Sequence, residues 1–352
     1  MTIIVTGAAG FIGSNFVLNW LNKEEENVVS LDNLTYAGNL DNLASLSEDK
    51  RHFFIKGDIG DSNLILSTLK KYKPTAIINF AAESHVDRSI SAPDTFIETN
   101  ILGTYKLLQN TCSYWEELTE KPKKDFRFIH ISTDEVYGDL GKDARPFTEE
   151  NRYIPNSPYS ASKASSDHLV RAWHQTYNLP VVTTNCSNNY GSFQFPEKLI
   201  PLCIINAIND RPLPLYGDGK QIRDWLYVDD HCDAIRAALK GGKIGETYNI
   251  GGNTEKTNIQ VVELVCELLD NLKPRIDKIS YAQQISFVKD RQGHDRRYAI
   301  DSSKIQNELG WQPEETFESG MVKTVKWYLE HEEWVKNIIS GDYKKWIDNH
   351  YS

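Results

Sequence analysis

Short runs of aliphatic and β-branched residues alternate along the chain with longer segments whose apolar residues recur at helical spacing. A short apolar run bounded by turn residues predicts a buried strand, and apolar positions three and four residues apart predict an amphipathic helix. This alternation is typical of a doubly wound parallel sheet with helices on both faces. The predicted strands are Ile3–Thr6, Val28–Asp32, Phe53–Gly57, Ala76–Ala82, Phe126–Ser132, Val181–Cys186 and Thr247–Ile250. The predicted helices are Phe11–Lys23, Asp61–Tyr72, Thr95–Trp115, Pro158–Tyr177 and Asp230–Lys240.

The alternation of strands and helices breaks down after Cys186. A stretch rich in Asn, Pro and Gly follows, the alternation resumes briefly near residue 230, and the remainder is mixed. The sequence therefore predicts two interleaved units rather than two domains in series. The first is an α/β doubly wound domain made of residues 1–186 and about 227–251, and the second is a smaller discontinuous lobe made of about 187–226 and 252–352.

Composition narrows the class of protein. The chain has 352 residues, 40% of them hydrophobic, which is enough for a large core. Its formal net charge of −10 disfavours nucleic-acid and anionic-membrane partners, which bind basic surfaces. The apolar runs are far shorter than the ~20 residues of a membrane helix, and Met1 leads directly into a predicted strand, so we expect a cytoplasmic protein. Five scattered cysteines argue against a disulfide framework or a metal site.

A glycine-rich turn follows the first predicted strand. Gly7, Gly10 and Gly13 are spaced G-x-x-G-x-x-G, and an apolar helix is predicted to begin at Phe11. Glycine lets the backbone amides of such a turn approach a pyrophosphate, and the helix N-terminus adds a favourable partial charge. The spacing departs from G-x-G-x-x-G, but the position between a strand and a helix is the one that a dinucleotide-binding, Rossmann-type fold requires.

The second predicted strand ends in an acidic residue suited to a ribose. Asp32 lies 19 residues after Gly13, where a carboxylate can accept hydrogen bonds from both adenosine ribose hydroxyls and repel a 2′-phosphate. We therefore expect NAD rather than NADP as cofactor. Since ligands bind at the carboxyl ends of parallel strands, further contacts are expected after the third and fourth strands, at Asp58, Ile59, Phe80, Ala81 and Ala82. The alternative for Asp58 is a plain turn aspartate.

A tyrosine and a lysine share one face at the start of a predicted helix. Tyr159 and Lys163 are at i, i+4 spacing, which places the phenol beside the ammonium. A phenol with a pKa of about 10 is a poor base near neutrality, and an adjacent cation should lower that pKa. Lys163 can also hold the nicotinamide ribose hydroxyls. The Y-x-x-x-K pattern is common by chance, so its weight comes from the dinucleotide-binding turn and the strand end that precede it.

Two adjacent acids follow the predicted strand Phe126–Ser132. Thr133 is placed to hydrogen-bond a hydroxyl that is being oxidised, and Asp134 and Glu135 come directly after it. Two like charges at the end of a buried strand are unusual because a solvated loop would cost less. Desolvation and repulsion should raise at least one of their pKa values, which suits one carboxyl to donate a proton and the other to accept one. The alternative is a pair of turn acids.

These motifs together resemble the extended short-chain dehydrogenases/reductases, and among them the 4,6-dehydratases of dTDP-glucose. The resemblance is carried by segments 6–16 (TGAAGFIGSNF), 32–38 (DNLTYAG), 81–89 (AAESHVDRS), 132–138 (STDEVYG), 159–163 (YSASK) and 223–225 (RDW). It covers essentially the whole chain. Its narrowest part is the Asp-Glu pair, which similar epimerases lack. Ala8 stands where the family often has a second glycine.

The resemblance implies a hydro-lyase that converts dTDP-glucose into dTDP-4-keto-6-deoxyglucose while NAD is unchanged overall. Tyr159 would take the proton of the hydroxyl at carbon 4 as hydride passes to NAD. Glu135 would then remove the proton on carbon 5, and Asp134 would protonate the departing hydroxyl at carbon 6. Return of the hydride to carbon 6 would complete the cycle.

The resemblance also assigns binding residues. The cofactor residues beyond those named above are Phe11, Ile12, Asn33, Leu34, Thr35, Ser84, Thr99 and Asn189. The substrate residues are Glu83, His85, Thr133, Asn188, Lys198, Leu199, Pro214, Leu215, Tyr216, Arg223, Asn258, Asp290, Arg291, Gln292, Gly293 and His294. Physically, Lys198 and the fork of Arg223 can pair with diphosphate oxygens. For Arg291, Arg296 and Arg297 a surface ion-pair role is an equal alternative, as packing or capping is for His85.

Assembly and rival functions complete the expectations. By analogy with the superfamily, the helices Thr95–Trp115 and Pro158–Tyr177 should form a four-helix bundle with their copies in a homodimer. The apolar residues expected to support it are Leu102, Leu107, Leu108, Leu169, Val170 and Trp173. The rival functions are an epimerase, a decarboxylase, a dehydratase for another nucleotide sugar, and an NAD-sensing regulator without catalysis.

Overall fold

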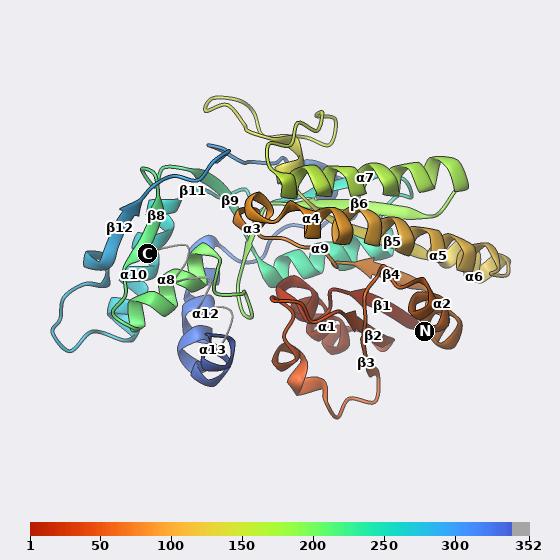
Figure 1. The fold of residues 1–352 in the computed structure, drawn as a ribbon, viewed down its shortest axis with the longest axis horizontal. Coiled ribbons are helices and arrows are strands. Elements are labelled where there is room, and N and C mark those ends of the chain that lie inside the picture. The colour runs from red at the N-terminus through yellow and green to blue at the C-terminus, as the bar shows by residue number, and fades with distance from the viewer. Residues whose placement is uncertain (340–352) are drawn as a thin grey trace.

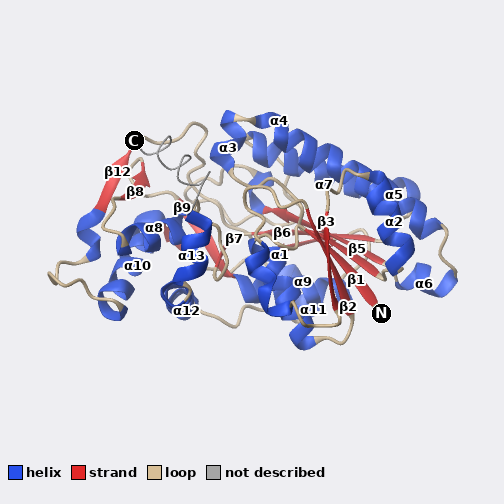
Figure 2. Cartoon of the chain, turned by 60° about the horizontal axis from the view of Figure 1, so that its bottom comes forward, coloured by secondary structure: helices blue, strands red, loops and turns tan. Residues whose placement is uncertain are grey.

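The centre of the molecule is a seven-stranded parallel sheet, drawn as a fan of strands in Figure 2. The structure is a computed structural model that describes residues 1–339. The strands lie in the order β10-β6-β5-β4-β1-β2-β3, and all neighbours are parallel. Their bounds are β1 Thr2–Thr6, β2 Asn27–Asp32, β3 His52–Lys56, β4 Ala76–Asn79, β5 Arg127–Thr133, β6 Val181–Cys186 and β10 Thr247–Ile250. The predicted doubly wound α/β sheet is confirmed.

Helices cover both faces of the sheet (Figure 1). One face carries α1 Phe11–Lys23, α9 Val228–Gly241 and α11 Ser303–Leu309, which share a core with the strands. The other face carries α2 Ser62–Tyr72, α5 Thr104–Glu116 and α7 Pro158–Tyr177. The order of the sheet reverses between β1 and β4, so the ends of these two strands form the crevice in which such sheets bind ligands.

The predicted helix Thr95–Trp115 is not one regular helix. The chain instead forms α3 Val86–Ser91, α4 Pro93–Phe96, a π-helical segment η2 Ile97–Gly103, and then α5. Inside the π-helical segment, the buried side chain of Asn100 accepts from Glu83 N at 2.8 Å. It also donates to Glu83 O at 3.0 Å and to Ser162 Oγ at 2.8 Å. These long-range hydrogen bonds stabilise a wider turn that helical periodicity could not predict.

The smaller lobe has its own core. A three-stranded sheet consists of β7 Asn188–Tyr190, β9 Ile222–Tyr227 and β11 Glu255–Thr257, and a parallel pair consists of β8 Leu213–Tyr216 and β12 Ile285–Val288. Helices α8 Leu199–Ile208, α10 Asn258–Leu272, α12 Phe317–Glu330 and α13 Glu332–Ile339 pack around them. The short elements of the chain are η1 Leu40–Leu46, α6 Glu120–Asp125, η3 Asp134–Tyr137 and η4 Tyr281–Gln284.

The two cores are joined where β9 runs directly into α9. The predicted division placed 252–352 in the smaller lobe, but Ile305 of α11 and Trp311 pack in the core of the large sheet. Residues 340–352 of that division lie outside the described residues. We propose the division predicted from the sequence with one change, which assigns the α11 segment to the doubly wound domain. Among residues 1–339 no helix is long and apolar enough to cross a membrane.

The turn between β1 and α1 depends on close backbone packing. A Cβ atom on Gly13 would lie 2.1 Å from the carbonyl oxygen of Gly7. The backbones of Gly7 and Gly13 cannot move apart without displacing the helix. We predict that Gly13→Ala lowers the free energy of unfolding by about 1–3 kcal/mol, measured by urea unfolding without NAD. Gly141→Ala is the matched control, because its nearest neighbour would be 3.8 Å away. Equal stability of the two variants would contradict the prediction.

Candidate active site

A cavity of about 290 Å³ opens at the carboxyl ends of the parallel strands. Its walls contain every residue predicted to bind the cofactor except Leu34, together with Thr133, Asp134 and Glu135. Leu34 does not line the cavity. Its backbone has a φ of 55°, and its N–H donates to Oδ1 of Asp32 at 2.8 Å. Its side chain packs instead against the core that α1 and α9 share with the sheet.

The glycine turn and Asp32 form one wall of this cavity. Gly7 has a φ of 65°, and a Cβ atom there would lie 2.7 Å from Ala81 N. Only glycine allows the turn to pass this close to the end of β4. The second carboxylate oxygen of Asp32 accepts from Ala9 N at 2.9 Å, so both oxygens hold the loops that surround the site. Burial raises the pKa of Asp32, and the two backbone hydrogen bonds oppose this shift.

Asp58 has a structural role in addition to its place in the cavity wall. One carboxylate oxygen accepts from Gly60 N at 2.6 Å, as in a turn aspartate, and the other accepts from Asn33 Nδ2 at 2.9 Å. Both Asn33 and Asp58 line the cavity. One carboxylate oxygen of Asp58 therefore acts as in a plain turn aspartate. The other oxygen, through its hydrogen bond with Asn33, joins two segments that were predicted to contact the cofactor.

Helix α7 delivers Tyr159 and Lys163 to the end of β5. The helix begins at a capping box in which Ser157 and Ser160 exchange hydrogen bonds, with Pro158 at the first helical position. Lys163 Nζ donates to Ile131 O at 2.8 Å, and both residues line the cavity. The ring of Tyr159 meets that of Phe96 edge to face at 6.3 Å. Strand β5 and helix α7 thereby place the phenol, the ammonium and Thr133 in one cavity wall.

The pKa of Tyr159 differs from the prediction. Burial raises it well above the ordinary value, and the nearby carboxyl group of Glu135 raises it further, while a hydrogen bond with Thr133 lowers it. The prediction that Lys163 lowers this pKa is therefore wrong for the protein by itself. The physical reason is that the ammonium is turned toward the Ile131 carbonyl, so desolvation dominates.

Asp134 and Glu135 experience different surroundings. Burial raises the pKa of Asp134 well above its usual range, and the charges of Glu135 and Asp224 act in the same direction. Burial also raises the pKa of Glu135, but the cations Arg291, Lys198 and Arg223 act against it. Asp134 is 2% exposed, and its Oδ2 has no hydrogen-bond partner among residues 1–339. Burial thus raises the pKa of both acids, far above the usual range for Asp134, while the nearby cations limit the shift for Glu135.

A second cavity of about 160 Å³ adjoins the first on the side of the smaller lobe. Predicted substrate residues that line it are His85, Asn188, Lys198, Leu199, Pro214, Leu215, Tyr216, Arg223, Asn258, Arg291 and His294. Glu83, Asp290, Gln292 and Gly293 line neither cavity. The residues common to both cavities are Glu135, Asn188, Asn189, Gln194, Glu197 and Lys198. A ligand that spans the two cavities would pass between these shared residues, which include Glu135.

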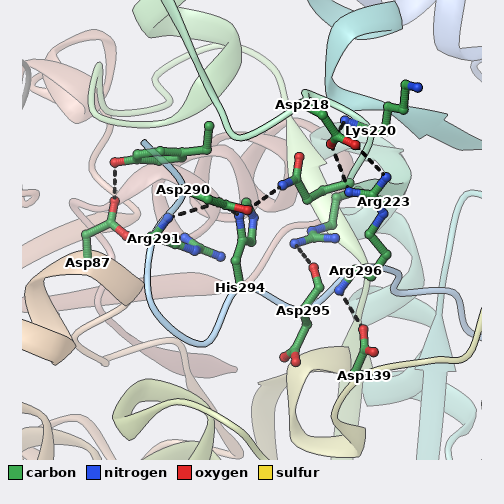
Figure 3. Close-up of polar contacts among 12 residues, drawn as sticks. Asp87, Asp139, Asp218, Lys220, Arg223, Asp290, Arg291, His294, Asp295 and Arg296 are labelled. Carbon is green, nitrogen blue, oxygen red and sulfur yellow. Dashed lines mark hydrogen bonds and ion pairs between the residues drawn. The ribbon is translucent and has the colours of Figure 1, made fainter. Parts of the chain in front are cut away.

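Residues 289–298, which follow β12, form a strap, and its residues Arg291, His294 and Tyr298 line the second cavity. Figure 3 shows polar contacts of this strap. Asp290 does not line the cavity but accepts from His294 Nδ1 at 2.6 Å, which holds the turn of the strap. Arg291 Nη1 lies 3.3 Å from Asp87 on α3, so the strap reaches the large domain. Buried Arg223 donates to Asp295 O at 3.0 Å and lies 4.4 Å from the ring centre of Tyr298.

For each of the three arginines and for His85, the structure can be compared with the two roles considered above, a place in the substrate pocket or a structural contact. Arg291 lines the second cavity, whereas Arg296 forms an exposed ion pair with Asp218 at 2.8 Å. Arg297 binds Glu255 through two hydrogen bonds of 2.6 Å. His85 both lines the cavity and caps α3, because its Nδ1 accepts from Arg88 N at 3.4 Å.

Sequence reasoning missed several residues of the two walls. Glu197 is 5% exposed, lines both cavities and accepts from Arg88 Nε at 2.9 Å. Gln194 also lines both, and Tyr298 lines the second. Their only signal was proximity to predicted residues, since they lie in segments without regular periodicity.

Comparison with known proteins agrees with this geometry. Residues 4–324 match the family model described as GDP-mannose 4,6 dehydratase. The dTDP-glucose 4,6-dehydratase of Xanthomonas campestris pv. campestris is 58% identical over 343 residues, 97% of each chain. The dTDP-glucose 4,6-dehydratase of Streptomyces venezuelae, solved with NAD bound, has a TM-score of 0.87 and 45% identity, covering 96% of this chain and 100% of that one.

The same fold also occurs among epimerases, at lower identity. The UDP-glucose 4-epimerase of Thermotoga maritima has a TM-score of 0.82 but 27% identity, covering 94% of this chain and 99% of that one. The fold is therefore common to both groups, while the sequence similarity is much greater to the dehydratases. The chain belongs to the nucleotide-sugar 4,6-dehydratase family of the extended short-chain dehydrogenases/reductases, together with the enzymes named dTDP-glucose 4,6-dehydratase.

Proposed function

We propose that this protein is an NAD-dependent hydro-lyase that converts dTDP-glucose into dTDP-4-keto-6-deoxyglucose. The observation that carries the proposal is the junction of the two cavities. There Glu135 borders the predicted substrate cavity, and Asp134, Tyr159 and Lys163 line the predicted cofactor cavity beside it. This arrangement brings a redox site and an acid–base pair to the same point, as an elimination adjacent to a transient ketone requires.

The first cavity fits NAD in both shape and chemistry. The glycine turn leaves room at the N-terminus of α1 for a pyrophosphate, and the buried carboxylate of Asp32 faces the position expected for the adenosine ribose. Lys163 would hold the nicotinamide ribose. When bound, NAD accepts a hydride from carbon 4 and returns it to carbon 6, and the positive charge of its nicotinamide ring favours the phenolate of Tyr159.

The remaining steps follow from the protein side chains. Tyr159 takes the proton of the carbon 4 hydroxyl, with Thr133 donating to or accepting from the same oxygen. The ketone at carbon 4 acidifies carbon 5, from which Glu135 removes a proton. Asp134 gives its proton to the hydroxyl leaving carbon 6, so water departs and a carbon–carbon double bond remains. Hydride at carbon 6 and a proton at carbon 5 then complete the 4-keto-6-deoxy sugar.

The electrostatic surroundings support this order of roles. Asp134 is buried next to Glu135 and Asp224, which favours its protonated form and suits a general acid. Glu135 faces three cations, which favour its carboxylate and suit a general base. The cations that would pair with the diphosphate, Lys198 and Arg223, therefore also set the charge of the catalytic base.

The substrate is tested directly by product formation. Purified protein incubated with dTDP-glucose should give a 4-keto product detected by its absorbance in alkali, and UDP-, CDP- and GDP-sugars should give much less. Equal turnover of another nucleotide sugar would change the proposed substrate, and formation of a carbon 4 epimer without loss of water would indicate an epimerase instead.

We also propose that the protein is cytoplasmic and forms a homodimer. The cytoplasmic location is supported by five cysteines that are all buried and unpaired. The predicted support for the dimer needs a correction, because Leu107, Leu108 and Val170 are buried under the protein's own sheet. The dimer would instead use the exposed apolar residues Ile97 and Leu102 of η2 and Tyr105 of α5, which are 43%, 41% and 36% exposed, with Leu169 and Trp173 of α7 beside them.

The first prediction from the proposed function concerns retention of the cofactor. Hydride leaves and returns within one turnover, so exchange of NAD in mid-cycle would strand the ketone intermediate. We predict that gently purified protein contains NAD by native mass spectrometry and needs no stoichiometric NAD for turnover. Cofactor-free protein whose activity consumes one NAD per product would contradict the redox-neutral scheme.

The second prediction separates oxidation from elimination. Glu135→Gln keeps the size of the side chain but removes the base, so product formation should fall by ~100-fold or more. Absorbance of NADH near ~340 nm, the usual reduced-nicotinamide band, should still appear because carbon 4 oxidation survives. Tyr159→Phe is the matched variant, and it should lose NADH formation and product together. A wild-type rate in Glu135→Gln would exclude the acidic pair from the elimination.

The third prediction tests the dimer surface. Leu102→Glu places a charge on the proposed helical interface, where burial of an unpaired carboxylate is costly. Sedimentation at micromolar concentration should show a dimer for the wild type and a monomer for this variant. Ile276→Glu is the control, because Ile276 is fully exposed on the smaller lobe. A wild-type monomer, or dissociation of both variants alike, would contradict the proposed interface.

A further inference from the structure

A group of buried polar residues lies beneath the catalytic residues, between α7 and β5. Asp167 follows Lys163 by one helical turn and is 5% exposed, while His130 and Ser132 of β5 are 0% and 3% exposed. Ser132 Oγ donates to Asp167 Oδ2 at 2.7 Å. His130 Nε2 lies 3.1 Å from Asp167 Oδ1, which places the imidazole in electrostatic contact with the carboxylate.

The buried polar residues continue from His130 across the sheet to the cofactor cavity. Thr6 Oγ1 donates to Asn79 Oδ1 at 2.6 Å, and Ala81 N donates to Thr6 Oγ1 at 3.3 Å. Asn79 Nδ2 lies 3.3 Å from His130 Nδ1 and can only donate, so His130 accepts there. The proton of the neutral imidazole is therefore on Nε2, the atom that faces Asp167.

Lys163 and Asp167 hold neighbouring residues of the same strand. Lys163 Nζ donates to the carbonyl oxygen of Ile131, and Asp167 accepts from the hydroxyl of Ser132. Ile131, Ser132 and Lys163 all line the cofactor cavity, whereas Asp167 does not. Asp167 can therefore act on the cofactor site only through the residues it contacts.

The charges in this region need an explanation because water is excluded. Burial lowers the pKa of Lys163, and the negative charge of Asp167 is the main opposing influence. Burial and the charge of Lys163 lower the pKa of His130, so the imidazole does not supply a second cation. Without Asp167, the partner of this buried ammonium within residues 1–339 would be an uncharged carbonyl oxygen, which does not offset the loss of solvation.

We propose that Asp167 is a positioning residue that keeps Lys163 in its cationic form and, through Ser132, holds the strand end that carries Thr133, Asp134 and Glu135. The inference rests on the proposed function, which gives Lys163 its role at the nicotinamide ribose and beside Tyr159. Asp167 touches neither cofactor nor substrate in this scheme.

The direction of the pH effect follows from the groups around Lys163. The groups that interact with it electrostatically are Asp167 on its own helix, His130 on β5 and Cys186 on β6. Tyr159, Asp134 and Glu135 line the same cavity. His130 stays neutral, and burial raises the pKa of Cys186 to about 12. Removing the charge of Asp167 must lower the pKa of Lys163, so its ammonium is lost at a lower pH.

The experiment compares Asp167→Asn with Ser132→Ala by calorimetric titration of NAD across a range of pH. The asparagine keeps the size and can still accept from Ser132, but it has no charge. NAD affinity should fall on the alkaline side when Lys163 loses its proton, and in Asp167→Asn this fall should begin at least ~1 pH unit lower than in the wild type. Ser132→Ala keeps the charge and should leave the alkaline limb in place.

Two outcomes of this titration would overturn the inference. An alkaline limb at the same pH in Asp167→Asn and wild type would show that the carboxylate does not support the ammonium. An equal shift in Ser132→Ala would show that strand position, rather than charge, controls affinity. The wild-type dehydration assay is independent of both, so failure of the proposed function remains distinguishable from failure of this inference.

Unfolding in urea without NAD provides a second test if Asp167→Asn folds poorly. Lys163→Met leaves the carboxylate of Asp167 buried without an opposite charge. Asp167→Asn leaves the ammonium of Lys163 buried in the same way. If the two groups form a charge pair, the double variant should lose less free energy of unfolding than the two single variants lose in sum. Strictly additive losses, or a double variant that is less stable than their sum, would overturn the pairing.

Discussion

The hydrogen bond from Lys163 to the carbonyl oxygen of Ile131 joins helix α7 to strand β5, next to the central strand β4 of the sheet. It places an ammonium where water is excluded, at the edge where a parallel sheet binds ligands. Every other feature of the redox site must accommodate that buried charge. The carboxylate of Asp167 lies one turn further along the same helix, and neutral His130 faces it from the strand.

Buried charge also accounts for the division of labour between the two acids. Asp134 lies against other carboxyl groups, whereas Glu135 points toward the cations of the smaller lobe. The pKa values of these neighbouring residues are therefore raised to different extents, because the two side chains face different parts of the tertiary structure. The pKa of Glu135, the proposed catalytic base, depends on Arg223 and Arg291, which lie far from it along the chain.

The two-lobed construction makes this dependence possible. The strap that carries Arg291 reaches Asp87 of the large domain, and β9, which carries Arg223, leads directly into α9 of the large domain. The cations proposed to bind the substrate and the groups proposed for the redox step are thus held on separate cores, and Glu135 lines both cavities. The epimerase with a closely similar fold indicates that this architecture is not specific to dehydration, so the chemistry depends on the side chains at the junction.

The sequence by itself determined the doubly wound sheet, the glycine turn, Asp32 and the positions of Tyr159 and Lys163, because periodicity and local spacing encode strands, helix faces and turns. It could not determine the π-helical segment around Asn100, the burial of Asp167 among residues of β5, or the role of Glu197 at the cavity junction. These features depend on contacts between residues far apart in the chain. The pKa of Tyr159 was also decided by tertiary structure, because desolvation depends on what surrounds a group rather than on its neighbours in sequence.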